Sequence, residues 1–222
     1  MRIAVSPPMK KYTLSKLKNG FLSFEYCGIL EGNFLFMQEE LYHFSLYNGW
    51  YPIGFDVNEE YEIIVKCEET YKLINGCFNK DTKCWYYTTQ NQSLVDCNIM
   101  LINKTKTYCL ENESVSLYYF SDRYQKFLEL FFEEYTSIYR FYLSLYQNNK
   151  LNYNTMVFLP RKFQLGAYKR DNLIVFSEVS ENLKKEIHKL AHEMAHAYAV
   201  RGYTFMGGLA ERNACRMECI II

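Results

Sequence analysis

The spacing of apolar residues changes near residue 120, and this change constrains the fold more than any other feature of the chain. Before it, short runs rich in β-branched and aromatic residues alternate with turn-forming stretches such as "NKDTK" and "NKTK". Short runs punctuated in this way predict the strands of an antiparallel sheet or sandwich. The expected strands cover residues 20–26, 33–37, 61–67, 71–76, 83–89, 96–102 and 114–120.

After residue 120 the apolar residues follow a helical repeat, and the first segment contains neither glycine nor proline. The expected elements are helices over residues 121–147, 180–200 and 208–222 and strands over residues 153–160 and 172–178. Ser121 and Ser180 fit the N-caps of the first two helices, and Gly202 follows the end of the second. We therefore expect an α+β protein, with an antiparallel β-sheet domain over residues 1–120 and an α+β domain over residues 121–222.

Charge and composition exclude several classes of protein. The formal net charge is zero, and basic residues do not cluster with aromatic ones, so we expect no binding to nucleic acid. No run of about 18 apolar residues predicts a membrane span, and Pro7 and Pro8 interrupt the apolar core that a signal peptide needs. The eight cysteines contain no CxxC pair, which favours reduced thiols in a cytoplasmic protein over a disulfide framework. Nothing in the sequence indicates the oligomeric state.

The segment "KLAHEMAHAYAV" contains a His-Glu-x-x-His pattern inside an expected helix. Residues four apart lie on one helix face, so His192 and His196 can direct ring nitrogens at one metal ion. Glu193 is then angled toward a water molecule on that metal. Its carboxylate takes a proton from this water as the water attacks a carbonyl. The alternative is a structural pair of histidines one turn apart. His188 lies about 12 Å along the helix axis from His196, too far to share the ion, and is interpreted as an exposed or outer-sphere histidine.

A zinc hydrolase needs a third protein ligand, and the best candidate is Glu211 in "GGLAERNA". It begins the next expected helix after a glycine-rich turn, although a carboxylate is also favoured at any helix N-terminus. Glu218 lies two turns further along the same face, where it either orients a ligating histidine or is solvated. The sequence thus predicts one Zn²⁺ ion held by His192, His196 and Glu211, with Glu193 as the general base.

These residues resemble the gluzincin aminopeptidases, the group of aminopeptidase N and leukotriene hydrolase. Glu211 in "LAER" occupies the place of the glutamate in the family's "LNEG"-like segment, and "LGAYKRDNLIVFSE" is similar to its "GAMENWGLITYRE" edge strand. More faintly, "LYNGWYPIG" resembles a stretch of the β-sheet domain that precedes the catalytic domain in that family. The resemblance implies a thermolysin-like catalytic domain cut short at the C-terminus. It also implies a peptide substrate that pairs with the edge strand at Gly166, Ala167 and Lys169.

Two departures from the family bear on activity. Lys169 stands where the family has a glutamate that binds the substrate's α-amino group, and a cation there repels an ammonium. The tyrosine that donates to the oxyanion in the family has no counterpart, unless Tyr198 or Tyr203 replaces it. The expectation is a zinc-dependent, aminopeptidase-like metallopeptidase. The alternatives are a catalytically weak or inactive zinc- and peptide-binding homologue, or a fragment that needs a C-terminal helical domain.

Overall fold

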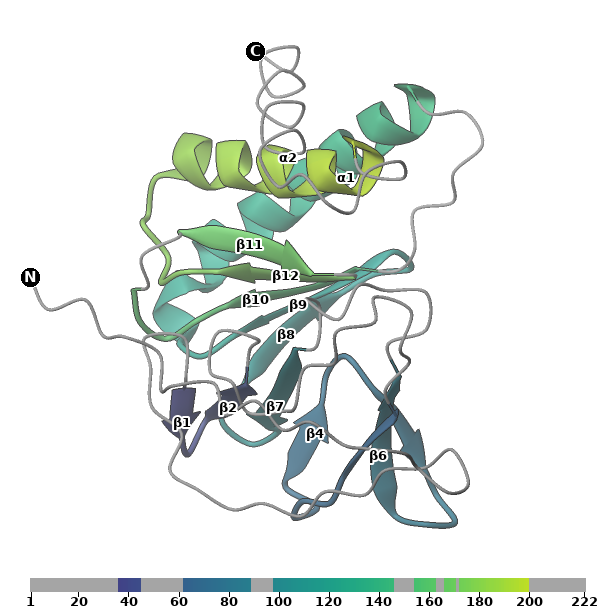
Figure 1. Ribbon diagram of the computed structural model, residues 1–222. Coiled ribbons are helices and arrows are strands. Elements are labelled where there is room, and N and C mark those ends of the chain that lie inside the picture. The colour runs from purple at the N-terminus through teal and green to yellow at the C-terminus, as the bar shows by residue number, and fades with distance from the viewer. Residues whose placement is uncertain are drawn as a thin grey trace, which may run out of the picture.

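The computed structural model describes residues 36–44, 62–88, 98–145, 154–162, 166–170 and 172–199 of the 222-residue chain (Figure 1). In these residues the strands form three sheets. Two long helices, α1 (Gln125–Leu145) and α2 (Leu183–Ala199), lie together over the largest sheet. The fold is therefore a mixed α+β fold, as the sequence predicted at this coarse level. No helix in the described part is long and apolar enough to cross a membrane.

The largest sheet is mixed, with the strand order β11-β12-β10-β9-β8. Its strands are β8 (Tyr108–Glu111), β9 (Val115–Tyr119), β10 (Asn154–Phe158), β11 (Ala167–Arg170) and β12 (Leu173–Phe176). The three central strands run parallel, and β8 and β11 pair antiparallel at the two edges. Every residue of β9, β10 and β12 is buried, because both faces of a parallel sheet are covered by other layers.

The two helices cover one face of this sheet. Phe131 of α1 meets Phe158 and Phe176 edge-on, with ring centroids 5.2 and 5.5 Å apart. A 3-10 turn, η3 (Asp122–Tyr124), precedes α1. The predicted cap at Ser121 is only partly confirmed, since the residue stands at the N-cap position of η3 but its side chain makes no capping hydrogen bond.

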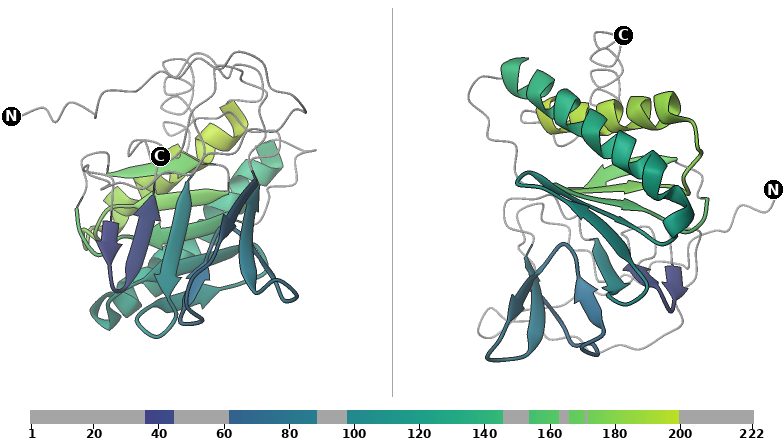
Figure 2. Two further views of the ribbon diagram at one scale, coloured as in Figure 1. Left: turned by 60° about the horizontal axis from the view of Figure 1, so that its bottom comes forward. Right: turned by 180° about the vertical axis from the view of Figure 1, so that it is seen from behind.

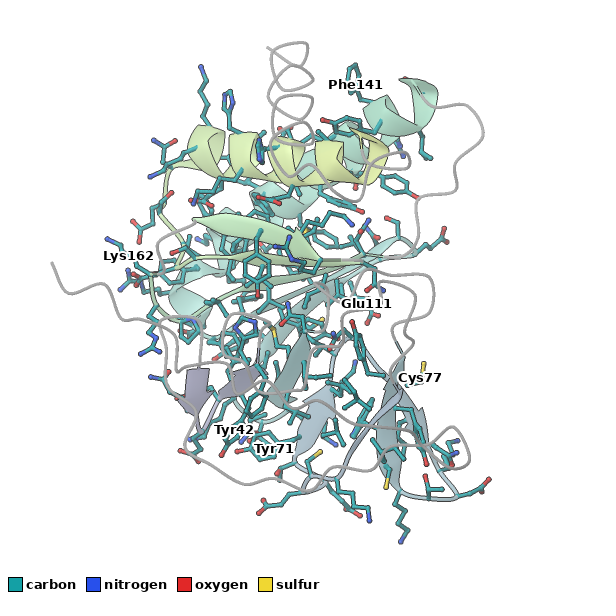
Figure 3. The ribbon with its side chains drawn as sticks, in the orientation of Figure 1. Tyr42, Tyr71, Cys77, Glu111, Phe141 and Lys162 are labelled. Atoms are coloured by element: carbon teal, nitrogen blue, oxygen red, sulfur yellow. The ribbon has the colours of Figure 1, made fainter. Side chains whose placement is uncertain are left out.

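Two smaller antiparallel sheets form further layers beyond the opposite face (Figure 2). The first has the order β1-β2-β7-β4 and consists of β1 (Phe36–Gln38), β2 (Leu41–Phe44), β7 (Ile99–Asn103) and β4 (Tyr71–Leu73). Met100 and Leu41 share a core with Val157 and Val175 of the large sheet. On the other side of this sheet, Tyr42 and Tyr71 meet edge-on, 5.4 Å between centroids (Figure 3).

The second small sheet has the order β3-β6-β5 and consists of β3 (Glu62–Val65), β6 (Cys84–Thr88) and β5 (Cys77–Asn79). Tyr87 of β6 packs with Leu73 and Leu101 of the neighbouring sheet. The molecule is thus built in layers: helices, mixed sheet, and two antiparallel sheets.

Two expectations need adjustment. Strands β8 and β9 precede residue 120 yet share a sheet with β10, β11 and β12, so the change in apolar spacing marks the start of α1 and not an edge of this sheet. Asn182, not Ser180, caps α2, because the Lys185 backbone N–H donates to Asn182 Oδ1 at 3.1 Å. The expected strand at 20–26, the helix at 208–222 and Gly202 lie outside the described residues.

Candidate functional site

Helix α2 carries the His-Glu-x-x-His pattern, and its apolar stripe fixes it against the rest of the fold. Leu190 and Met194 are almost completely buried in the core shared with the mixed sheet. From α1, the buried Tyr142 hydroxyl donates to the backbone carbonyl of Ala191 at 2.9 Å. Packing against the mixed sheet and the hydrogen bond from α1 therefore both fix α2 immediately before His192.

A buried ion pair within α2 lies beside the start of the edge strand β11. The Glu186 carboxylate is fully buried and accepts from Lys189 Nζ at 2.9 Å on each oxygen, and from Ser180 Oγ at 2.5 Å. Lys189 Cε lies 3.7 Å from where a Cβ on Gly166 would stand. Gly166 has a φ of +75°, which glycine adopts without strain, and its carbonyl accepts from the Ser177 N–H at 2.8 Å. The start of β11 is thereby placed against the middle of α2.

Glu193 lies on the same side of α2 as this ion pair. Residues 186, 189 and 193 are spaced three and four apart, so they form one stripe along the helix. Because Lys189 contacts Gly166, this stripe faces β11, and α2 is packed against β11. Only 6% of Glu193 is exposed, and carboxylates are rarely so buried without a structural or functional reason. The structure thus places a buried carboxylate at the junction of α2 and β11.

His192 is half-buried and directly precedes Glu193 on this unbroken helix. His196 lies one turn further along the same helix, so the backbone spacing that the motif requires is present, while the His196 side chain is outside the described part. Glu211 and Glu218 also lie outside it, as does Tyr203.

The described residues contain one of the expected zinc ligands, the half-buried His192. Among them no three His, Cys, Asp or Glu side chains form a group that could hold a metal ion. Two of the three expected ligands, the His196 side chain and Glu211, lie outside the described residues. What can be compared with a zinc site is the half-buried imidazole of His192, which is followed by the buried carboxylate of Glu193. A histidine followed directly by a glutamate on a helix is the combination of residue types that the HExxH pattern requires.

Strand β11 lies at the edge of the mixed sheet, next to α2 (Figure 1). Within the described ranges its one strand neighbour is β12, so its other backbone edge faces away from the sheet. Gly166 precedes the strand, and Ala167 and Lys169 belong to it. The three residues that the resemblance assigned to substrate binding therefore lie in, or directly before, the strand that packs against α2.

A buried polar cluster that the sequence did not reveal anchors β11 from the opposite face. Tyr168 Oη lies 2.6 Å from His43 Nε2 and accepts from Asn98 Nδ2 at 3.1 Å. Asn98 Oδ1 lies 2.9 Å from the same His43 nitrogen. Burial lowers the pKa of His43 to about 4, so the imidazole is neutral at pH 7. These residues come from three distant parts of the chain, and no local pattern marks them.

The candidate site therefore combines His192 and Glu193 of α2 with the edge strand that begins after Gly166. A scan against protein-family models found no match for the chain, and a search of curated proteins found none either.

Proposed function

We propose that this chain is a zinc-dependent metallopeptidase of gluzincin type that hydrolyses peptide bonds. The observation that carries the proposal is the junction of α2 and β11. There, one continuous helix presents His192, the buried Glu193 and the backbone position of His196 beside the edge strand of a mixed sheet. An extended peptide on β11 would therefore lie beside the residue assigned as the base.

His192, His196 and Glu211 would hold the zinc ion, and Glu218 would orient one of the histidines. Zinc, when bound, would supply Lewis acidity and lower the pKa of a water molecule. The Glu193 carboxylate would accept the proton of the attacking water and return it to the leaving amine. The packing of α2 against the mixed-sheet core and its hydrogen bond from Tyr142 keep this carboxylate in a fixed place.

The peptide substrate would bind along β11. An exposed strand edge offers backbone donors and acceptors to an extended peptide, which joins the sheet as an additional strand. Pairing of this kind positions a scissile bond beside α2, because β11 and α2 are in contact.

Turnover of a peptide library by the zinc-loaded protein tests the proposal. Glu193→Gln should lower kcat by at least about 100-fold, since removal of a general base typically costs 10²- to 10⁴-fold. The exposed Glu134 of α1 offers a matched control, and Glu134→Gln should leave turnover unchanged. Zinc content and the thermal melting temperature should be the same in all three proteins. A zinc-loaded protein that hydrolyses no peptide, or whose hydrolysis survives Glu193→Gln, would contradict the proposal.

A further inference from the structure

We propose that Tyr168 is a positioning residue for peptide binding, whose buried hydroxyl fixes the edge strand β11 to the first antiparallel sheet. This inference rests on the proposed peptidase function and assigns one step of it, the binding of peptide along β11, to a residue outside the His-Glu-x-x-His motif. It follows from the burial pattern of β11, from the contacts of the Tyr168 hydroxyl, and from the place of β11 at the edge of its sheet.

Tyr168 is the one residue of β11 that is buried. It is 5% exposed, whereas Ala167, Lys169 and Arg170 are half-buried. Tyr168 is directly opposite Val175 of β12, and both belong to the core between the mixed sheet and the first antiparallel sheet. Because side chains alternate between the two faces of a strand, the Tyr168 ring leaves β11 on the face opposite to that of Ala167, which packs toward the helices.

Two polar side chains from the first half of the chain hold the Tyr168 hydroxyl. Asn98 Nδ2 donates to Tyr168 Oη at 3.1 Å, and His43 Nε2 lies 2.6 Å from the same oxygen. The rings of His43 and Tyr168 are stacked, with 6.1 Å between their centroids. His43 belongs to β2, and Asn98 directly precedes β7. The hydroxyl therefore ties the edge strand to two neighbouring strands of the first antiparallel sheet.

The remainder of β11 is weakly held. The strand has four residues, and within the described ranges β12 is its one strand neighbour. Short elements at the edge of a fold open locally at a lower cost in free energy than central strands. His43 and Asn98 are almost completely buried, and buried polar groups that lose a partner are costly. Removing the Tyr168 hydroxyl therefore destabilises the closed position of β11 beside α2.

This anchoring affects peptide binding and not the chemical step. Only molecules with β11 in place can pair with a peptide, so the apparent dissociation constant equals the intrinsic constant divided by the fraction of such molecules. Once a peptide is bound, the strand is in place and the hydrolytic step proceeds at its usual rate. Loss of the anchor therefore raises KM and leaves kcat unchanged, whereas loss of the general base Glu193 lowers kcat.

The test compares Tyr168→Phe with Tyr135→Phe in zinc-loaded protein. Tyr135 is a matched control, because its fully buried hydroxyl accepts from Asn154 Nδ2 at 3.0 Å, between α1 and β10. Asn98→Ala removes the same anchor from its other side and is a second variant in case Tyr168→Phe folds poorly. We would measure kcat and KM with a library peptide that the parent hydrolyses, and amide hydrogen exchange of β11 without peptide.

Tyr168→Phe should raise KM by about tenfold, the equivalent of one lost hydrogen bond, and leave kcat unchanged. Exchange of the β11 amides should become faster by a similar factor. Asn98→Ala should have both effects, and Tyr135→Phe should have neither. An unchanged KM or unchanged exchange in Tyr168→Phe, or an equal rise of KM in Tyr135→Phe, would overturn the inference.

The two readouts separate this inference from the proposed function. Hydrolysis that depends on Glu193 while KM is the same in Tyr168→Phe as in the parent would overturn this inference alone. Faster exchange of β11 in Tyr168→Phe, in a zinc-loaded protein whose parent hydrolyses no peptide, would support the anchoring of the strand and contradict the proposed function.

Discussion

Replacing Lys189 with methionine should destabilise the protein strongly, because it leaves the charge of Glu186 buried without its cation. Glu186 is fully buried, and Lys189, which is 20% exposed, donates to both of its carboxylate oxygens at 2.9 Å. Removing one partner of a buried ion pair costs about 3–5 kcal/mol. The partial exposure of Lys189 and the remaining bond from Ser180 favour the lower end, about 3 kcal/mol. For a chain of 222 residues, this corresponds to a fall in melting temperature of about 6–12 °C.

Thermal unfolding of four proteins measures the effect: the unsubstituted chain, Lys189→Met, Glu186→Gln, and the double variant. The double variant should lose less stability than the two single variants together. In the double variant Glu186→Gln has removed the buried charge that Lys189→Met alone would leave without a cation. Lys185→Met, at an exposed position of the same helix, should change stability by less than about 0.5 kcal/mol. If Lys189→Met behaves like Lys185→Met, or if the two single effects are additive, the buried ion pair of Glu186 and Lys189 does not stabilise the fold.

Three further predictions concern the core. Burial lowers the pKa of His43 from 6.5 to about 4. Between these two values the unfolded chain protonates this histidine and the folded chain does not, so the free energy of unfolding should fall by about 3 kcal/mol as the pH drops from above 6.5 to 4. Urea unfolding should show this pH dependence, and His43→Gln should flatten it; equal curves would refute the assignment. Gly76→Ala should lower the free energy of unfolding by about 1–3 kcal/mol in the same urea assay, because the Cβ of the introduced alanine would lie 2.8 Å from the Tyr86 backbone oxygen. An unchanged midpoint of urea unfolding would contradict this packing. Tyr142→Phe removes the bond to the Ala191 carbonyl and should cost about 1 kcal/mol, and a melting temperature equal to that of the parent would show that the bond contributes nothing.

The sequence predicted elements whose pattern is long or fully apolar. Helices α1 and α2 and the buried strands β9, β10 and β12 all fall within the expected ranges. The expected strand ranges missed β2, β5, β8 and β11, of which only β11 was covered by the family resemblance. Strands β5 and β8 are only three and four residues long and mostly exposed, so no extended alternation of apolar and polar residues marks them, and their neighbours in the sheet define them. The partition into three sheets was also not predicted, because strand pairing is a long-range property.

The candidate site was predictable only where its signal is local. The spacing of His192 and His196 on one helix is visible in a few residues of sequence, and the helix is confirmed. The cap was misplaced because Ser180 and Asn182 are both good N-caps two residues apart, and the Ser180 hydroxyl instead donates to Glu186. The contact between Lys189 and Gly166 depends on how a helix packs on an edge strand, which no local pattern encodes. The metal-binding and catalytic roles remain predictions.

Zinc stoichiometry tests the central claim most directly. The chain, purified without chelator and equilibrated with zinc, should hold one zinc ion, measured by elemental analysis and by titration. His192→Ala should abolish this binding. Glu193→Gln should retain it, because Glu193 is assigned to the water and not to the metal. His188→Ala, on the same helix and outside the assigned ligand set, should also retain it. A chain that holds no zinc under these conditions, or that binds zinc equally well after His192→Ala, would contradict the account.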